Sequence, residues 1–344
     1  MTVAAKPRFT KKILLLVTLG LATLVVYLYY FVGTVNIAAV IRQINLFYYA
    51  SAFVAFLGST LFSALAWQSL MDNLAIRTKI RRVLLFVWAG MFFDVTVPDP
   101  GWSGDLSKAY LLAKSSGEDA GKVAASVVSQ KIIGMALSLV GLIIGLLLLA
   151  SNYTLPLEAL VFVALVLFLS VFSLFLVSYL SAKPKVTKKM LGWLIRVVSA
   201  VRRGRWDSSS FSRRSEETLE RFHEGMNTLG DNPKALTRPI IFSLFVLGLD
   251  ISIVFLVFTC LGYPAPIDKV LIVYALTGAL QSAGISFLGF TEIVMSGSYT
   301  VLGIPPALSL SATLLTRVIT LWFKLVISYF PLQWVGVKTL LKKL

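Results

Sequence analysis

Two carboxylates in this sequence follow glycine-rich breaks in apolar runs, and each precedes a basic residue in the next apolar run. Asp105 follows P-D-P-G-W-S-G and is succeeded by Lys131. Glu292 follows G-I-S-F-L-G-F-T and is succeeded by Arg317 at nearly the same interval. Prolines and glycines end helices, and broken backbone at membrane depth survives only where it lines a cavity or is buried in protein. The pattern therefore predicts two polar sites inside a membrane.

These breaks suggest how an anionic headgroup would be bound. We expect the breaks to supply free backbone N–H groups, and acids to neutralise the cations when no substrate is present. Asp105 and Glu292 are the expected gating ion-pair partners, and Asp250, near the middle of an apolar run, is a third candidate. Such pairs can equally be architectural and hold hairpins in place. The candidate binding residues are Lys108, Lys131, Arg317, Gly101, Gly104 and Gly289, and the helix-breaking residues are Pro98, Pro100 and Gly284.

Metal and cofactor chemistry has little support in the sequence. The single cysteine, Cys260, lies in an apolar run, and the single histidine, His223, lies in a polar segment where we expect it to be solvated. Without a second histidine or cysteine no zinc site is predicted. No nucleophile and base stand in a catalytic pattern, so we predict no bound cofactor and no enzymatic activity.

Composition places the chain among polytopic helical membrane proteins. Of its 344 residues 57% are hydrophobic and only 14% are charged. The net charge of +16 would suggest nucleic acid in a soluble domain. Here the basic residues lie between apolar runs, where they commonly orient the chain in the membrane. We therefore expect no nucleic-acid partner.

The apolar runs predict a single all-α membrane domain over residues 1–344. Two broken runs, 83–116 and 268–304, have arms too short to cross a bilayer core about 30 Å thick, so each is expected to be a re-entrant hairpin. The basic loops place both termini in the cytoplasm of a multi-pass protein of the cell membrane. Residues 44–150 and 239–331 then form an inverted-topology repeat, the arrangement of alternating-access transporters. The six predicted transmembrane helices are 13–32, 46–70, 123–150, 157–180, 239–261 and 305–330.

A basic insert, 181–238, separates the two repeats. Apolar residues recur in it at helical spacing, at Met190, Leu194, Val197, Val198 and Val201, with lysines and arginines nearby. This pattern is typical of an amphipathic helix that lies in the cytoplasmic interface over anionic headgroups.

The motifs around these residues resemble the transmembrane region of lysylphosphatidylglycerol synthases and their stand-alone flippase-like relatives. That family carries P-x-P-G-G-D-x-x-R, then S-V-V-x-D-R, and later G-x-G-x-x-E. The counterparts here are P-D-P-G-W-S-G-D-L-S-K ending at Lys108, S-V-V-S-Q-K ending at Lys131, and F-L-G-F-T-E ending at Glu292. The likeness covers roughly residues 10 to 335, but lysine replaces arginine at 108 and 131, and lysine does not reproduce the bidentate grip of arginine on phosphate.

The resemblance implies a lipid flippase that moves an anionic phospholipid or a polyprenyl-linked lipid between leaflets. It does not imply aminoacyl transfer, which in the family belongs to an additional soluble domain. Two alternatives remain open from the sequence: a small-solute or ion-coupled transporter, and a non-transporting scaffold for a glycosyltransferase or lipid-modifying partner. Anionic membrane lipids are the expected partners, and a second copy of the chain is a further candidate.

Overall fold

The computed structural model describes residues 44–97, 101–152, 157–201, 208–282 and 289–341. Every regular element in these ranges is helical. The predicted first span, 13–32, and the predicted helix breakers Pro98, Pro100 and Gly284 lie outside the described residues.

Long apolar helices dominate the described part of the chain, in which five helices are long and apolar enough to cross a membrane. They correspond to the predicted spans other than 13–32, and the protein is therefore an integral, multi-pass membrane protein. The last of them continues through a π-helical segment, η3 (Val318–Phe323), directly after Arg317. The other parts of this last spanning helix are α13 (Pro306–Arg317) and α14 (Lys324–Leu341). The remaining spanning helices are α3 (Leu46–Asn73), α6 (Ala120–Asn152), α7 (Leu157–Ala182) and α10 (Thr237–Cys260).

Short helices occupy both broken segments. The first contains α4 (Ile80–Thr96) and α5 (Ser103–Ser116), and the second contains α11 (Ile267–Ser282) and α12 (Phe290–Val301). The longest of them, α4, has 17 residues and is only about 26 Å long at the helical rise. Glycines with positive φ stand at the helix ends, at Gly117 after α5 and at Gly289 before α12, where side chains with a Cβ are strained.

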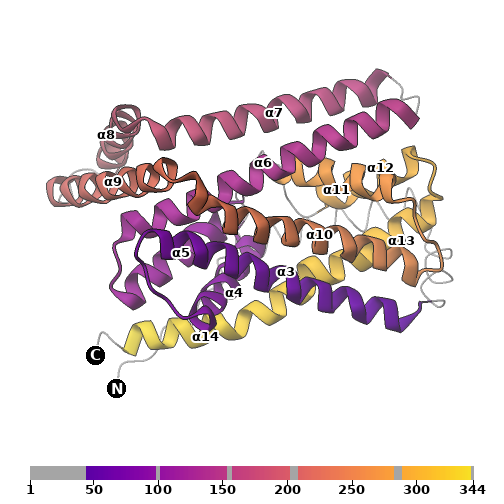
Figure 1. Ribbon diagram of the computed structural model, residues 1–344, viewed down its shortest axis with the longest axis horizontal. Helices are drawn as coiled ribbons and strands as arrows, with labels where there is room; N and C mark the ends of the chain where they lie inside the picture. The colour runs from indigo at the N-terminus through magenta and orange to yellow at the C-terminus, as the bar shows by residue number, and fades with distance from the viewer. Residues whose placement is uncertain (1–43, 98–100, 153–156, 202–207, 283–288, 342–344) are drawn as a thin grey trace.

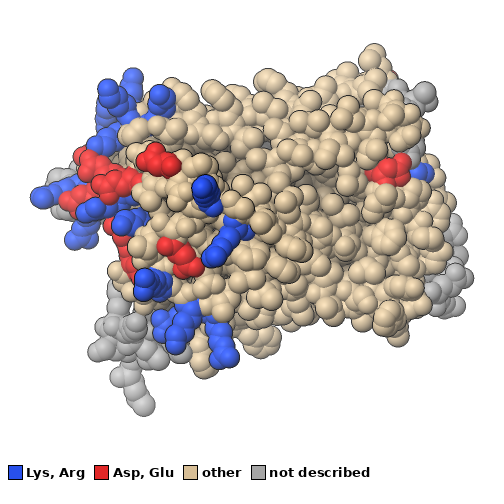
Figure 2. All heavy atoms as spheres, in the orientation of Figure 1, with Lys and Arg blue, Asp and Glu red and all other residues tan. Residues whose placement is uncertain are grey.

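The basic insert forms two helices and a 3₁₀ turn, α8 (Pro184–Val201), α9 (Ser208–Asp231) and η2 (Pro233–Leu236). Figure 1 shows α4 and α5 in the half of the molecule where α8 and α9 lie, and α11 and α12 in the opposite half. Figure 2 shows most charged side chains of that face at the end with α8 and α9, beside a broad uncharged surface. The two broken segments therefore occupy opposite halves of an apolar body.

The helices of 44–150 and those of 239–331 make closely similar sets of contacts, element by element. The helices α3 and α10, which are counterparts, pack against each other. The hairpin helix α4 packs on α14, and its counterpart α11 packs on α6. The helix α5 contacts α6, as α12 contacts α13. Each hairpin is thus held by the long helix of the other half.

The insert is docked firmly on the first half. A Cβ on Gly225 of α9 would lie 2.8 Å from the Cβ of Ala125 of α6, so the two helices cross closely. The prediction that His223 is solvated in a polar segment is wrong. His223 lies on the inner face of α9 with 5% exposure, and its Nδ1 lies 2.9 Å from the carbonyl oxygen of Ser181. A carbonyl only accepts, so Nδ1 carries the proton.

Candidate functional site

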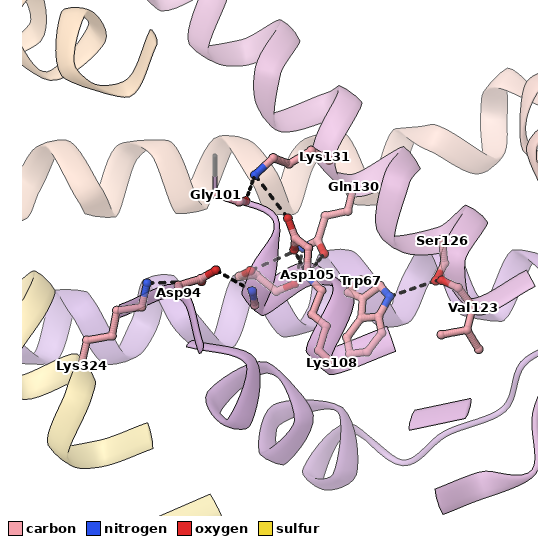
Figure 3. A network of polar contacts seen from close by, with 12 residues as sticks. Trp67, Asp94, Gly101, Asp105, Lys108, Val123, Ser126, Gln130, Lys131 and Lys324 are labelled. Carbon is pink, nitrogen blue, oxygen red and sulfur yellow. Dashed lines mark hydrogen bonds and ion pairs between the residues drawn. The ribbon is translucent and has the colours of Figure 1, made fainter. Parts of the chain in front are cut away.

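Asp105, on the first turn of α5, holds two lysines at the centre of a polar network (Figure 3). Its Oδ1 lies 2.7 Å from Nζ of Lys108, one turn further along the same helix. Its Oδ2 lies 3.3 Å from Nζ of Lys131 on α6. One carboxylate is therefore shared by two ammonium groups, which leaves the cluster with one net positive charge. The pairing of Asp105 with Lys131, expected from their order in the sequence, is present, while its role in gating stays a prediction.

Lys131 lies where the two hairpins approach each other. Its Nζ donates to the carbonyl oxygen of Gly101 at 2.6 Å and lies 5.2 Å from the ring centroid of Trp102. Gly101 has a φ of +78°, and a Cβ placed on it would lie 3.7 Å from the carbonyl oxygen of Gln281 in α11. The side chain of Lys131 remains 21% exposed. An anion that reaches this junction can therefore contact the ammonium.

Lys108 lies deeper in the protein than Lys131. Its Nζ donates to Oε1 of Gln130 at 3.0 Å and lies 5.1 Å from the ring centroid of Trp67. The amide of Gln130 in turn donates to the carbonyl oxygen of Ser63 at 2.9 Å. The side chain of Lys108 is only 9% exposed. Of the two lysines, Lys131 is the better placed to meet a ligand, and Lys108 fixes the position of Asp105.

The backbone N–H groups of Gly104, in the first turn of α5, and of Gly289, just before α12, are not free as the sequence suggested. The N–H of Gly104 donates to Oδ1 of Asp94 at 2.9 Å, and the N–H of Gly289 donates to Oε2 of Glu292 at 2.7 Å. Gly101 contributes its carbonyl to Lys131. Unsatisfied N–H groups are costly in a medium without water, so carboxylates occupy them in the unliganded protein.

Asp94 is the residue that sequence reasoning missed. It accepts from Gly104 in α5, and its Oδ2 lies 3.4 Å from Nζ of Lys324 on α14. It thereby joins the first hairpin to the long helix of the other half. The available signal was an acidic residue inside the otherwise apolar run of α4, a setting in which acids are usually functional or paired.

The second site is a buried ion pair at the start of α12. The Nε of Arg317 donates to Oε1 of Glu292 at 2.6 Å, and the same carboxylate caps the N–H of Gly289. The side chain of Glu292 is 4% exposed and that of Arg317 is 16% exposed. The pair predicted from the sequence is thus formed, and it joins the first turn of α12 to the end of α13.

Asp250 is held by hydroxyl groups rather than by a cation. Ser59 of α3 donates to its Oδ1 at 2.6 Å, and Tyr274 of α11 donates to its Oδ2 at 3.2 Å. Within the described ranges Asp250 forms no salt bridge, so the structure corrects its assignment as an ion-pair residue. Its carboxylate connects α3, α10 and α11, because packing brings both hydroxyls to the same level of the bundle.

Metal-binding side chains do not gather in the part of the chain that the structure describes: no three histidine, cysteine, aspartate or glutamate residues there could share an ion. Cys260 is buried, and its Sγ donates to the carbonyl oxygen of Val257. The ammonium groups of Lys108 and Lys131 and the guanidinium of Arg317 are instead donors suited to an anion.

Comparison with known proteins gives one family and several archaeal relatives. The model of the family described as "Lysylphosphatidylglycerol synthase TM region" matches residues 13–328. The UPF0104 membrane protein PH1989 of Pyrococcus horikoshii is 24% identical over 317 residues, which are 90% of this chain and 92% of that protein. The UPF0104 membrane protein MJ1595 of Methanocaldococcus jannaschii is 23% identical over 336 residues, 95% of this chain and 96% of that one. No solved structure matches the chain significantly.

Proposed function

This chain belongs to the family of the lysylphosphatidylglycerol synthase transmembrane region, and from that membership we propose that it moves an anionic lipid between the leaflets of the cell membrane. The lipid is a phospholipid or a polyprenyl-linked lipid, and the protein carries out no covalent chemistry on it. The observation that carries the proposal is the position of Lys131 at the junction of two broken helices that come from opposite halves of the molecule.

The exchangeable packing of the two halves supports an inverted repeat. Each hairpin contacts the long helix of the opposite half, α4 on α14 and α11 on α6. Two hairpins that enter from opposite sides place their tips near the midplane, which is where transporters of this architecture bind substrate. With the basic insert in the cytoplasm, hairpin 83–116 enters from the cytoplasmic side and hairpin 268–304 from the outside.

The contacts of Lys131 suggest how a phosphate is admitted. Asp105 is paired with both Lys131 and Lys108, and its one negative charge offsets only half of their positive charge. A lipid phosphate at the junction replaces the carboxylate as the partner of Lys131, while Lys108 retains Asp105. The singly charged phosphate then brings the cluster of Asp105, Lys108 and Lys131 from one net positive charge to none, which favours binding of the headgroup. Gly101 and Trp102 then border the headgroup.

The salt bridge of Asp94 with Lys324 is suited to report the state of the first hairpin. It joins α4 to α14, and both side chains are partly exposed. Exposed pairs contribute little to stability, so this pair can break at small cost when α4 moves along α14. We assign it a gating role alongside Glu292 and Arg317.

Leaflet exchange of fluorescent lipids in reconstituted vesicles tests the proposal. The lipids are phosphatidylglycerol, phosphatidylcholine and a polyprenyl phosphate, and the variant is Lys131→Met. Lys114→Met is the matched control, since Lys114 lies on the same hairpin and contacts only the exposed Tyr110 among the partners that the structure gives it. We expect exchange that is selective for anionic lipids, lost in Lys131→Met and retained in Lys114→Met.

Two results would overturn the proposal. One is folded wild-type protein that exchanges none of the three lipids, which would favour a solute transporter or a scaffold. The other is equal exchange by Lys131→Met and by the control variant, which would remove Lys131 from the transport path.

A further inference from the structure

A second feature of the apolar body is a groove between α6, α10 and α11. It encloses about 160 Å³. Its walls are aliphatic side chains and small residues, with leucines and an isoleucine from α10. Further lining residues include Leu137, Ser138, Gly141 and Ile144 of α6 and Tyr274 and Gly278 of α11.

Aromatic rings pack where α3 meets the last helix, the counterparts of α10 and α6. Exchange of the halves replaces α6, α10 and α11 by the last helix, α3 and α4. There Phe323 packs edge-on against Phe53 and Phe56 of α3, with ring centroids 4.8 and 5.8 Å apart. Large aromatic side chains therefore occupy the contact between α3 and the last helix, whereas small and aliphatic side chains line the groove between α6, α10 and α11.

The groove begins close to the cation at the hairpin junction. Ser138 follows Lys131 by two turns on the same helix, about 10 Å along its axis. Gly278 precedes Gln281 by one turn of α11, and Gln281 is the residue whose carbonyl meets Gly101. The polar junction and the apolar groove therefore lie next to each other along α6 and α11.

We propose that this groove holds one hydrocarbon chain of the lipid whose phosphate lies at Lys131. The inference rests on the proposed function and adds where the apolar part of the substrate lies. A lipid that presents its phosphate to the junction has to keep its chains out of water, and the groove supplies an apolar surface within reach of the headgroup. The lipid enters sideways, between α6 and α10, and not between α3 and the last helix.

Photolabelling tests this placement without relying on transport. The probe is phosphatidylglycerol with a diazirine in one acyl chain, in vesicles of phosphatidylcholine, and labelled residues are identified by mass spectrometry. Leu165 of α7, which is 52% exposed, reports labelling by bulk lipid. We expect groove residues of α6 and α10 to be labelled several times more than Leu165, and unlabelled phosphatidylglycerol to compete only in the groove.

Two neighbouring isoleucines provide matched variants. Ile144 lines the groove and is 46% exposed, whereas Ile143 is 44% exposed and does not line it. Ile144→Trp is expected to fill the groove and reduce groove labelling about tenfold, which corresponds to about 1.4 kcal/mol of lost binding. Ile143→Trp is expected to leave labelling unchanged. Gly278→Phe is a second filling variant, since a Cβ there would lie 4.0 Å from Oγ of Ser138 and would not clash.

The outcomes separate the groove from the function. Groove labelling no stronger than that of Leu165, or equal labelling in the two tryptophan variants when both are folded, would overturn the groove. Selective lipid exchange without groove labelling would keep the function and refute the groove. Saturable groove labelling in a protein that exchanges no lipid would keep the groove as a lipid site and refute translocation.

Discussion

Replacing Glu292 with glutamine is the sharpest test of the buried pair that holds the second hairpin. The carboxylate bonds Nε of Arg317 at 2.6 Å and caps the N–H of Gly289 at 2.7 Å. Glutamine has a similar shape and can still accept from Gly289. The substitution therefore removes the negative charge and leaves the guanidinium of Arg317 without a counter-ion.

The expected cost follows from burial. Loss of one partner of a buried pair costs about 3–5 kcal/mol. Because the side chain of Arg317 is 16% exposed and water reaches part of it, we expect the lower end, about 3 kcal/mol. Arg317→Met leaves Glu292 with its bond to Gly289, so about 2 kcal/mol is expected. The double variant removes both charges and is expected to cost about 1 kcal/mol, far less than the sum, since an uncharged replacement for a buried pair is often close to neutral.

The assay is reversible unfolding of the purified protein in detergent micelles, with the four proteins compared as a double-mutant cycle. The cycle isolates the coupling between the two side chains. Single-variant costs below about 1 kcal/mol, or a double-variant cost equal to their sum, would refute the reasoning. The pair would then be a solvated contact that does not stabilise the packing of α12 against α13.

Three further predictions follow from the described contacts. Gly104→Ala places a methyl group against the Asp94 carboxylate, so the free energy of unfolding should fall by more than about 2 kcal/mol. Gly134→Ala meets open space and should raise the free energy of unfolding by up to about 1 kcal/mol. Thermal unfolding measures both changes. Lys324→Met breaks a partly exposed pair and should change unfolding by less than about 1 kcal/mol while it alters the lipid exchange rate. Lys188 donates to Glu220 at 2.6 Å, which lowers the pKa of Glu220 and raises the pKa of Lys188. The ion pair between Lys188 and Glu220 is therefore complete above the ordinary glutamate pKa of about 4.3 and is lost as pH falls through the lowered pKa. Proteolysis of α8 should accelerate on acidification, and Glu220→Gln should remove that pH dependence.

Much of the fold was predictable from local features of the sequence. Long apolar runs fix the positions of α3, α6, α7 and α10, because a helix is the simplest way for a single segment to satisfy its backbone in a bilayer. The proline- and glycine-rich segments coincide with the interruptions between α4 and α5 and between α11 and α12. The order of acid and cation in each half predicted the pairs Asp105 with Lys131 and Glu292 with Arg317, and both pairs are formed.

The choice of partners for backbone groups was not predictable in the same way. The sequence suggested free N–H groups at the breaks, but Asp94 and Glu292 occupy those of Gly104 and Gly289. Glu292 lies within one turn of its glycine. Asp94 reaches Gly104 only because α4 and α5 pack face to face around the hairpin.

The sequence by itself determined that this is a helical membrane protein with two interrupted segments, each carrying an acid and followed by a cation. Helix length, helix breaks and hydrophobicity depend on neighbouring residues, and so they can be read along the chain. Only the tertiary structure decided that His223 is buried, that Asp94 joins α4 to α14, and that a groove is open between α6, α10 and α11. These features depend on side chains from segments far apart in the sequence, and the packing of the helices alone brings such side chains into contact.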